Sequence, residues 1–227
     1  SSDDTIFKIK YLFKNEINDG IIKIYINKKN HGGPAFSRNF GISKTTFEYI
    51  YLCDGDDIWF PNLTKVYNQI FLKYNPDIIS SERIFFQNYN DSKIKIYRKY
   101  QFYQLSKFNF LSNPIITSSV AAKKSVLQEF IFNQKNNLTG IEDYDCWLRM
   151  INNNIKFFKI SKELVLYRKT GNSLSSNKFK ILIKLYLMFR NNFLRERNYF
   201  MKLANIYAFI RLLIFIFDKF INLILRK

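Results

Sequence analysis

Residues 48–61 read EYIYLCDGDDIWFP, an apolar run followed at once by three carboxylates, Asp54, Asp56 and Asp57, around one glycine. The run EYIYLC predicts a buried strand, and the acidic residues predict a turn at its carboxyl end. Ligands of open α/β sheets bind at the carboxyl ends of strands. Like charges this close repel, and a divalent cation relieves the repulsion, so the stretch predicts a metal site that could also hold a nucleoside diphosphate. The alternative is a solvated polar turn before a helix.

The segments around this stretch alternate between helical and extended patterns. Helical spacing covers residues 4–14, 37–45, 63–73 and 143–151. Extended patterns cover residues 21–26, 76–79 with a continuation at 83–86, 114–121 and 164–167. The alternation predicts an α/β domain with a mostly parallel sheet flanked by helices.

A second acidic cluster, EDYD, occupies residues 142–145. Acids in the first turn of a helix are favoured by its dipole, and Thr139 with Glu142 fits a capping box, so a purely structural role accounts for the cluster. Asp145 and Arg149 have the spacing of an ion pair within one helix. The functional interpretation is that one carboxylate accepts a proton from an attacking hydroxyl.

A third segment, NHGGP at residues 30–34, is a turn by composition, and Arg38 and Asn39 follow it. The glycines allow close backbone approach, and Arg38 could bind a phosphate. The alternative is that Arg38 pairs with a nearby aspartate.

Composition excludes several classes of protein. The 227 residues are 47% hydrophobic and 18% aromatic, which argues against a disordered chain. Two cysteines and one histidine, without zinc-ligand spacing, argue against a disulfide scaffold and a Cys/His zinc site. The net charge of +18, from 36 basic and 18 acidic residues, points to anionic partners.

Half of this excess charge lies in the tail, residues 177–227, which has 11 basic and 2 acidic residues and a helical, aromatic-rich pattern. The longest charge-free run, residues 203–210, is shorter than the roughly 18 apolar residues that a membrane span needs. We therefore expect a basic amphipathic helix that lies flat on an anionic membrane. The alternative is a helix packed on the domain or in an oligomer.

Four segments in order resemble those of the family 2 glycosyltransferases, which have the GT-A fold. They are residues 30–41 (NHGGPAFSRNFG), 48–61, 142–150 (EDYDCWLRM) and 167–175 (YRKTGNSLS). The resemblance covers about residues 1–176, so we expect a GT-A domain there and a membrane-associating tail over 177–227. The start, SSDDT, resembles the end of an earlier family segment, so the first strand is expected upstream and the chain is expected to be truncated.

The resemblance implies roles for the acidic residues. Asp56 would be the principal metal ligand, and Asp57 would support it. Asp54 would lie against the donor's ribose or the metal. Asp143 would be the catalytic base, and Glu142 is the weaker candidate.

The resemblance also implies roles outside the carboxylates. Arg38 and Asn39 would shape the nucleotide site, and Arg168 would belong to a loop that closes over the diphosphate. The family often has a metal-binding histidine where this chain has Thr170.

The implied function is inverting sugar transfer, assisted by Mn²⁺ or Mg²⁺, from a nucleotide-sugar donor, a UDP-sugar first among them. The acceptor would be a hydroxyl of a growing bacterial surface glycan: lipooligosaccharide, capsule or a lipid-linked oligosaccharide. The protein would lie peripherally on the inner face of the cytoplasmic membrane, without nucleic acid. Three alternatives remain: a basic nucleic-acid-binding protein without catalysis, a nucleotidyltransferase, and an inactive glycosyltransferase fragment.

Overall fold

The structure is a computed structural model that describes residues 3–27, 29–87, 100–169 and 177–224. The chain divides into two compact units, Ser1–His31 and Gly32–Lys227.

The first unit is helical. It contains α1 (Thr5–Leu12), which confirms the helix expected over 4–14, and the short α2 (Lys14–Asn18). The strand expected over 21–26 is wrong, because these residues have no regular structure. A strand is stable only beside a hydrogen-bonded neighbour, and the described part of this unit offers none.

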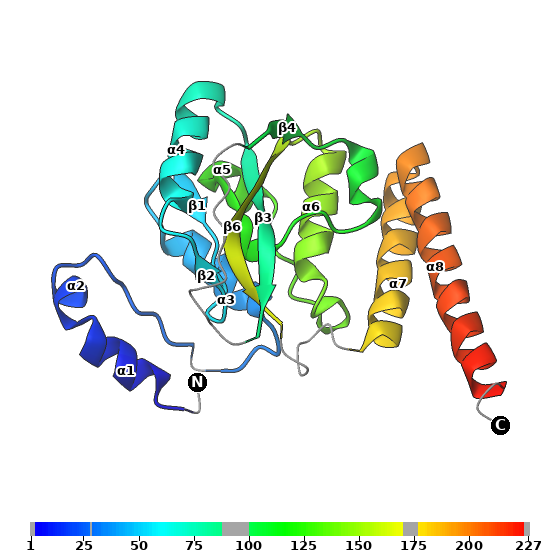
Figure 1. Ribbon diagram of the computed structural model, residues 1–227, viewed down its shortest axis with the longest axis horizontal. Coiled ribbons are helices and arrows are strands. Elements are labelled where there is room, and N and C mark those ends of the chain that lie inside the picture. The colour runs from blue at the N-terminus through cyan, green and yellow to red at the C-terminus, as the bar shows by residue number, and fades with distance from the viewer. Residues whose placement is uncertain (1–2, 28, 88–99, 170–176, 225–227) are drawn as a thin grey trace. The chain divides into compact units, whose positions relative to one another are not determined.

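The second unit is built on one sheet (Figure 1). Its strands are β1 (Tyr49–Tyr51), β2 (Ile58–Trp59), β3 (Ile78–Phe86), β4 (Phe102–Gln104), β5 (Ala121–Lys123) and β6 (Phe157–Arg168). The order is β1-β5-β3-β6-β2, and β4 pairs with β6. The long central pair β3–β6 is parallel, and the other described pairs are antiparallel. The α/β class is confirmed, but the sheet is mixed rather than mostly parallel.

The described antiparallel pairs, β1–β5, β3–β5, β2–β6 and β4–β6, join strands that are far apart in the sequence, so no hairpin turn sets their direction. The chain enters β5 directly from η3 (Thr117–Ser119), a turn of 3-10 helix, in place of a crossover helix. The strand expected over 114–121 is therefore wrong except at Ala121. The Ser119 hydroxyl donates to the Ile116 carbonyl at 2.9 Å, and such local bonds compete with strand pairing.

Helices cover both faces of this sheet. The expected helices are confirmed as α3 (Pro34–Lys44), α4 (Leu63–Tyr74) and α6 (Glu142–Asn152), and α5 (Lys124–Glu129) follows β5. Successive strand residues point to opposite faces. Accordingly Ile78 packs in the core with α3, α5 and α6, while Ile79 packs in a second core with α4.

The tail forms a helical hairpin of α7 (Lys178–Glu196) and α8 (Tyr199–Ile224), joined through Arg197 in the left-handed region (φ 49°). Phe189 of α7 and Met201 of α8 belong to the same core as α6, so the alternative of a tail packed on the domain is confirmed for this part.

Helix α8 is also long and apolar enough to cross a membrane. The stretch Tyr199–Asn222 contains an 18-residue window with a mean hydropathy of 1.8, and only 22% of this window is buried. The length of the charge-free run is therefore not a sufficient reason to exclude a span.

Candidate active site

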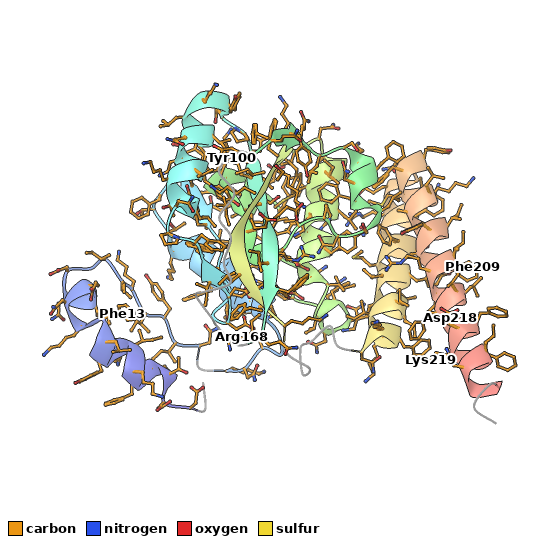
Figure 2. The ribbon with its side chains drawn as sticks, in the orientation of Figure 1. Phe13, Tyr100, Arg168, Phe209, Asp218 and Lys219 are labelled. Atoms are coloured by element: carbon orange, nitrogen blue, oxygen red, sulfur yellow. The ribbon has the colours of Figure 1, made fainter. Side chains whose placement is uncertain are left out.

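The acidic turn after β1 is held by one buried serine. The Ser118 hydroxyl accepts from the Asp54 N–H at 3.0 Å and donates to the Asp57 carboxylate at 2.5 Å. The second oxygen of Asp57 accepts from the Arg168 N–H at 2.8 Å, and the Trp59 indole donates to the Ser118 carbonyl at 2.7 Å. The turn is thus fixed to η3 and to the carboxyl end of β6, where Figure 2 labels Arg168.

Arg38 joins the two acidic clusters. From α3 it contacts both carboxylate oxygens of Asp54, at 2.8 and 2.9 Å, and one oxygen of Glu142, at 2.9 Å. Burial by itself would lower the pKa of Arg38, but the charges of Asp54, Asp143 and Glu142 outweigh it and raise that pKa. The pairing of Arg38 with a nearby aspartate, one of the two interpretations of this segment, is confirmed.

Glu142 is engaged on both oxygens. Besides the bond from Arg38, its second oxygen accepts from the Gly140 N–H at 2.6 Å, and the residue is only 4% exposed. The capping box with Thr139 is wrong, because α6 begins after Ile141 without a side-chain cap. Glu142 therefore positions Arg38 and the loop before α6, which leaves Asp143 as the stronger candidate for the base.

Asp143 is half-buried in the first turn of α6. Its carboxylate accepts from the Thr117 hydroxyl at 3.1 Å and from the Tyr144 N–H at 2.7 Å. Burial, and then the charge of Glu142, raise the pKa of Asp143 to about 6, against the opposing effects of Arg38 and the two hydrogen bonds. A carboxylate with a pKa near the working pH is suited to general base catalysis.

Asp56 differs from its two neighbours. It is exposed, and across the described ranges its carboxylate accepts no hydrogen bond and forms no ion pair. Burial raises the pKa of Asp57, and the bonds from Ser118 and Arg168 oppose the rise.

The described residues include no group of three acidic, histidine or cysteine side chains that could hold a metal ion. Since Mg²⁺ is usually held by one or two carboxylates together with substrate phosphates and water, Asp56 and Asp57 fit such a cation. Asp54, already bound by Arg38, does not join them in this arrangement.

Of the remaining predicted residues, Arg168 contacts this turn, whereas the side-chain bonds of Asn39 go to Phe132. The Asn39 amide donates to the Phe132 carbonyl at 2.7 Å and accepts from the Phe132 N–H at 2.9 Å, so it fixes the chain after α5. The Arg168 side chain is exposed and donates to the Asp56 carbonyl at 3.1 Å. Thr170 and most of the segment 167–175 lie outside the described residues.

A cleft of about 450 Å³ opens between α3 and the end of β1, beside Arg38 and Asp54. Its lining residues are Pro34, Ser37, Arg38, Gly41, Ile42, Ile50, Tyr51, Leu52, Cys53, Asp54 and Gly55. This volume is in the range of small-molecule sites. Burial, and then the charges of the acidic turn, raise the pKa of Cys53 to about 11, so its thiol is no nucleophile at neutral pH.

Sequence reasoning missed Thr117 and Ser118, the hydroxyls that hold both acidic clusters. The run ITSS after Pro114 contains a usable signal, because consecutive serine and threonine residues favour local turns over strands.

Comparison with known proteins agrees with this architecture. The model of glycosyl transferase family 2 matches residues 1–131. An uncharacterized glycosyltransferase of Methanocaldococcus jannaschii is 29% identical over 171 residues, which cover 73% of this chain and 58% of that protein. The UDP-Glc:alpha-D-GlcNAc-diphosphoundecaprenol beta-1,3-glucosyltransferase WfgD of Escherichia coli is 29% identical over 184 residues, covering 80% of this chain and 67% of WfgD.

The fold is shared with S. aureus TarS, whose residues 1–349 were solved with UDP. The TM-score is 0.60 at 14% identity, over 85% of this chain and 54% of the TarS fragment 1–349. The chain thus spans little more than half the length of the TarS fragment and of the M. jannaschii relative, and about a third of the longer TarS chain. Because the family model matches more than half of the chain, including Arg38 and the whole acidic turn, the chain belongs to glycosyl transferase family 2.

Proposed function

We propose that this chain transfers a sugar from a UDP-sugar to a hydroxyl of a lipid-linked surface glycan, with inversion at the anomeric carbon. One observation carries the proposal: the buried turn Thr117–Ser119 holds both a candidate base and a candidate diphosphate site. Thr117 donates to Asp143, and Ser118 donates to Asp57 of the acidic turn. Because one short segment holds both a base and a charged turn, it supports a displacement reaction, which needs these two groups positioned beside the same donor.

The donor would lie in the cleft between α3 and β1, with Asp54 toward the ribose. Arg38 lines this side of the cleft, whereas Asn39, whose amide is bonded to Phe132, is not among the lining residues. Arg168 contacts the acidic turn through its N–H and its side chain. The proposal of a UDP-sugar is supported by the printed name of WfgD, which contains UDP-Glc, and by TarS structures with UDP and with UDP-GlcNAc.

Asp56, supported by Asp57, would hold Mn²⁺ or Mg²⁺, which when bound neutralises charge on the departing diphosphate. Asp143 takes the proton of the acceptor hydroxyl as its oxygen attacks the anomeric carbon. The bond from that carbon to the diphosphate oxygen breaks on the opposite face, its electron pair leaves with UDP, and the configuration inverts. The positive charge of Arg38 keeps the pKa of Asp143 low enough for the ionised, basic form to exist at neutral pH.

We assign catalysis to residues 1–176 and membrane association to residues 177–227. The acceptor named for WfgD is linked to diphosphoundecaprenol, and α8 exposes an apolar surface that a lipid environment would cover. The protein would work at the inner face of the cytoplasmic membrane, where lipid-linked acceptors meet soluble nucleotide sugars.

Two measurements on the 227-residue chain test the donor site and the base separately. Thermal shift with UDP, GDP, dTDP and CMP, each with Mn²⁺ or with EDTA, should show stabilisation by UDP that depends on the metal and is lost in Asp56→Asn. Release of UDP from UDP-sugars should then fall by about 10²- to 10⁴-fold in Asp143→Asn, while UDP binding remains. The exposed Glu129→Gln is the matched control for charge, and it should behave as the parent.

A folded chain that no nucleotide stabilises would refute the donor site. Equal UDP release by Asp143→Asn and the parent would refute the base.

A further inference from the structure

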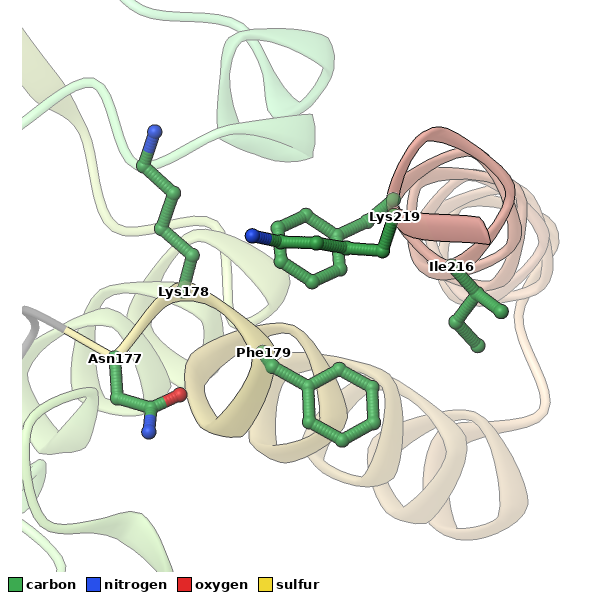
Figure 3. Close-up of a pocket in the computed structure, with 6 residues that line it drawn as sticks. Asn177, Lys178, Phe179, Ile216 and Lys219 are labelled. Carbon is green, nitrogen blue, oxygen red and sulfur yellow. The ribbon is translucent and has the colours of Figure 1, made fainter. Parts of the chain in front are cut away.

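A cleft of about 770 Å³ separates the start of α7 from the last turns of α8 (Figure 3). Its lining residues are Asn177, Lys178, Phe179, Phe215, Ile216 and Lys219. The Phe179 and Phe215 rings stack at 6.0 Å between centroids, with 19° between their planes. The Asn177 side chain accepts from the Lys180 N–H at 3.0 Å and fixes the start of α7. The cleft therefore has an ordered aromatic wall.

Two cations share this cleft. Figure 3 shows the Lys178 and Lys219 side chains on the same side of the Phe179 ring, with Lys219 reaching from α8 toward α7. The Lys219 ammonium lies 5.8 Å from the Phe215 ring centroid. Neither ammonium forms an ion pair with any described residue, and no acidic residue appears among the lining residues. Two unneutralised ammonium groups at one opening attract an anion.

The surface that continues from the cleft is apolar. Beyond Ala208, which is still in the core, the side chains of α8 turn outward. Their exposed fractions are 49% for Leu213, 56% for Ile214, 46% for Ile216, 62% for Phe217 and 58% for Phe220. An apolar surface this continuous is uncommon on proteins that stay in water, and it fits hydrocarbon.

We propose that the cleft is a specific binding site for the phosphate of an anionic membrane lipid, whose acyl chain lies along α8. Such a lipid satisfies both halves of the observed chemistry, since its phosphate neutralises Lys178 and Lys219 and its chain covers the apolar surface. Free phosphate would leave that surface in water, and a lipid without net charge would leave the cations unneutralised. The inference rests on the membrane association proposed for the tail.

The position of the cleft indicates a role for such a lipid in placing the catalytic site near the membrane. Asn177 follows Arg168 by nine positions, and Figure 2 shows Arg168 and Lys219 toward the same end of the second unit. A lipid bound between α7 and α8 would hold the carboxyl end of β6, and with it the acidic turn, near the membrane surface that carries the acceptor.

Flotation with vesicles tests the site. The chain is mixed with vesicles of phosphatidylcholine alone or of phosphatidylcholine with phosphatidylglycerol, and bound protein is measured. Lys178→Gln/Lys219→Gln is compared with Lys180→Gln/Lys202→Gln, which removes the same charge from exposed positions of the same hairpin. We expect the cleft variant to bind the anionic vesicles about tenfold more weakly than its matched control, because unspecific attraction is lost equally from both.

The outcomes separate this inference from the proposed function. If the two variants lose vesicle binding equally, or if the cleft variant binds anionic vesicles as well as the parent does, the lipid site is overturned while the membrane association stands. Failure of the parent to bind anionic vesicles would overturn both the lipid site and the membrane association of the tail. UDP binding is measured on the same variants, and if all of them bind UDP, the proposed donor site stands whatever the vesicle result. A parent dimer in solution that the cleft variant alone dissociates would assign the surface to a second copy and overturn the lipid site.

Discussion

Replacement of Arg38 by methionine should weaken the fold more than the loss of any exposed ion pair. Arg38 is the only described cation bonded to both acidic clusters, and its side chain is 12% exposed. The Glu142 side chain is 5% exposed and would keep just the Gly140 N–H as a donor. The Asp54 side chain is 36% exposed, so water compensates in part for the loss of its ion pair with Arg38. Methionine keeps most of the side-chain volume, so the change tests charge rather than packing.

The magnitude follows from this burial. Removing one partner of a buried pair costs about 3 to 5 kcal/mol, whereas an exposed pair is worth about 0 to 1 kcal/mol. Because Glu142 is buried and Asp54 is partly solvated, we expect Arg38→Met to lower the free energy of unfolding by about 3 kcal/mol. For a domain of this size that corresponds to a fall in Tm of about 6 to 12 °C.

Urea unfolding followed by the fluorescence of Trp59 and Trp147 measures the free energy. Lys123→Met is the comparison, because Lys123 pairs with Asp77 at 3.2 Å with both side chains more than 20% exposed. The free energy of unfolding of Lys123→Met should be lower than that of the parent by about 1 kcal/mol or less.

A double-mutant cycle isolates the pair itself. Glu142→Gln removes the charge that Arg38→Met leaves unpaired, so the double variant should be less destabilised than the sum of the singles by at least about 1 kcal/mol. Additivity within about 0.5 kcal/mol would show that the two side chains are not energetically linked and would refute the reasoning.

Four further predictions concern the site. Because burial raises the pKa of Asp143 to about 6, kcat/KM for UDP release should rise with pH through about 6; a flat profile there would contradict the assigned base. The folded state then holds that proton more tightly than the unfolded chain, so stability should fall as pH rises through about 6, and Asp143→Asn should abolish this fall in thermal melts. Ser118→Ala should lower the free energy of unfolding, measured by urea titration, by about 1 to 3 kcal/mol, because Asp57 loses a hydrogen-bond donor. A decrease no larger than that of the exposed Ser43→Ala would count against the role of η3 in holding the acidic turn. Iodoacetamide should label Cys53 slowly in the folded chain at neutral pH, since its pKa is raised to about 11, and labelling as fast as in urea would contradict that shift.

Local features of the fold could be predicted from the sequence. The acidic turn follows a strand because apolar and acidic residues are adjacent in the chain, and no distant contact is needed to place them. The helices α4 and α6 were predicted to within two residues for the same reason, since their apolar spacing is a property of the segment itself.

Pairings between distant segments could not be predicted in this way. The direction of β5 depends on how η3 delivers the chain to the sheet, and the run over 21–26 has the composition of a strand without a described partner. Arg38 had two chemically reasonable partners, a ligand phosphate or an aspartate. Glu142 lies 104 positions after Arg38 in the sequence. Only the tertiary structure brings it, together with Asp54, to the Arg38 guanidinium.

The three carboxylates of the acidic turn illustrate how a charged site can be folded before its ligands arrive. Asp54 is neutralised by Arg38, and Asp57 is stabilised by the Ser118 hydroxyl and the Arg168 N–H. That leaves one carboxylate, Asp56, exposed to water and without a partner among the described residues. Because each of its neighbours has its own donor, part of the repulsion that a cation would relieve is already offset in the protein alone, although the charges of Asp56 and Asp54 still raise the pKa of Asp57. In the proposed reaction, binding energy from the metal and diphosphate would then go to holding the donor rather than to assembling the turn.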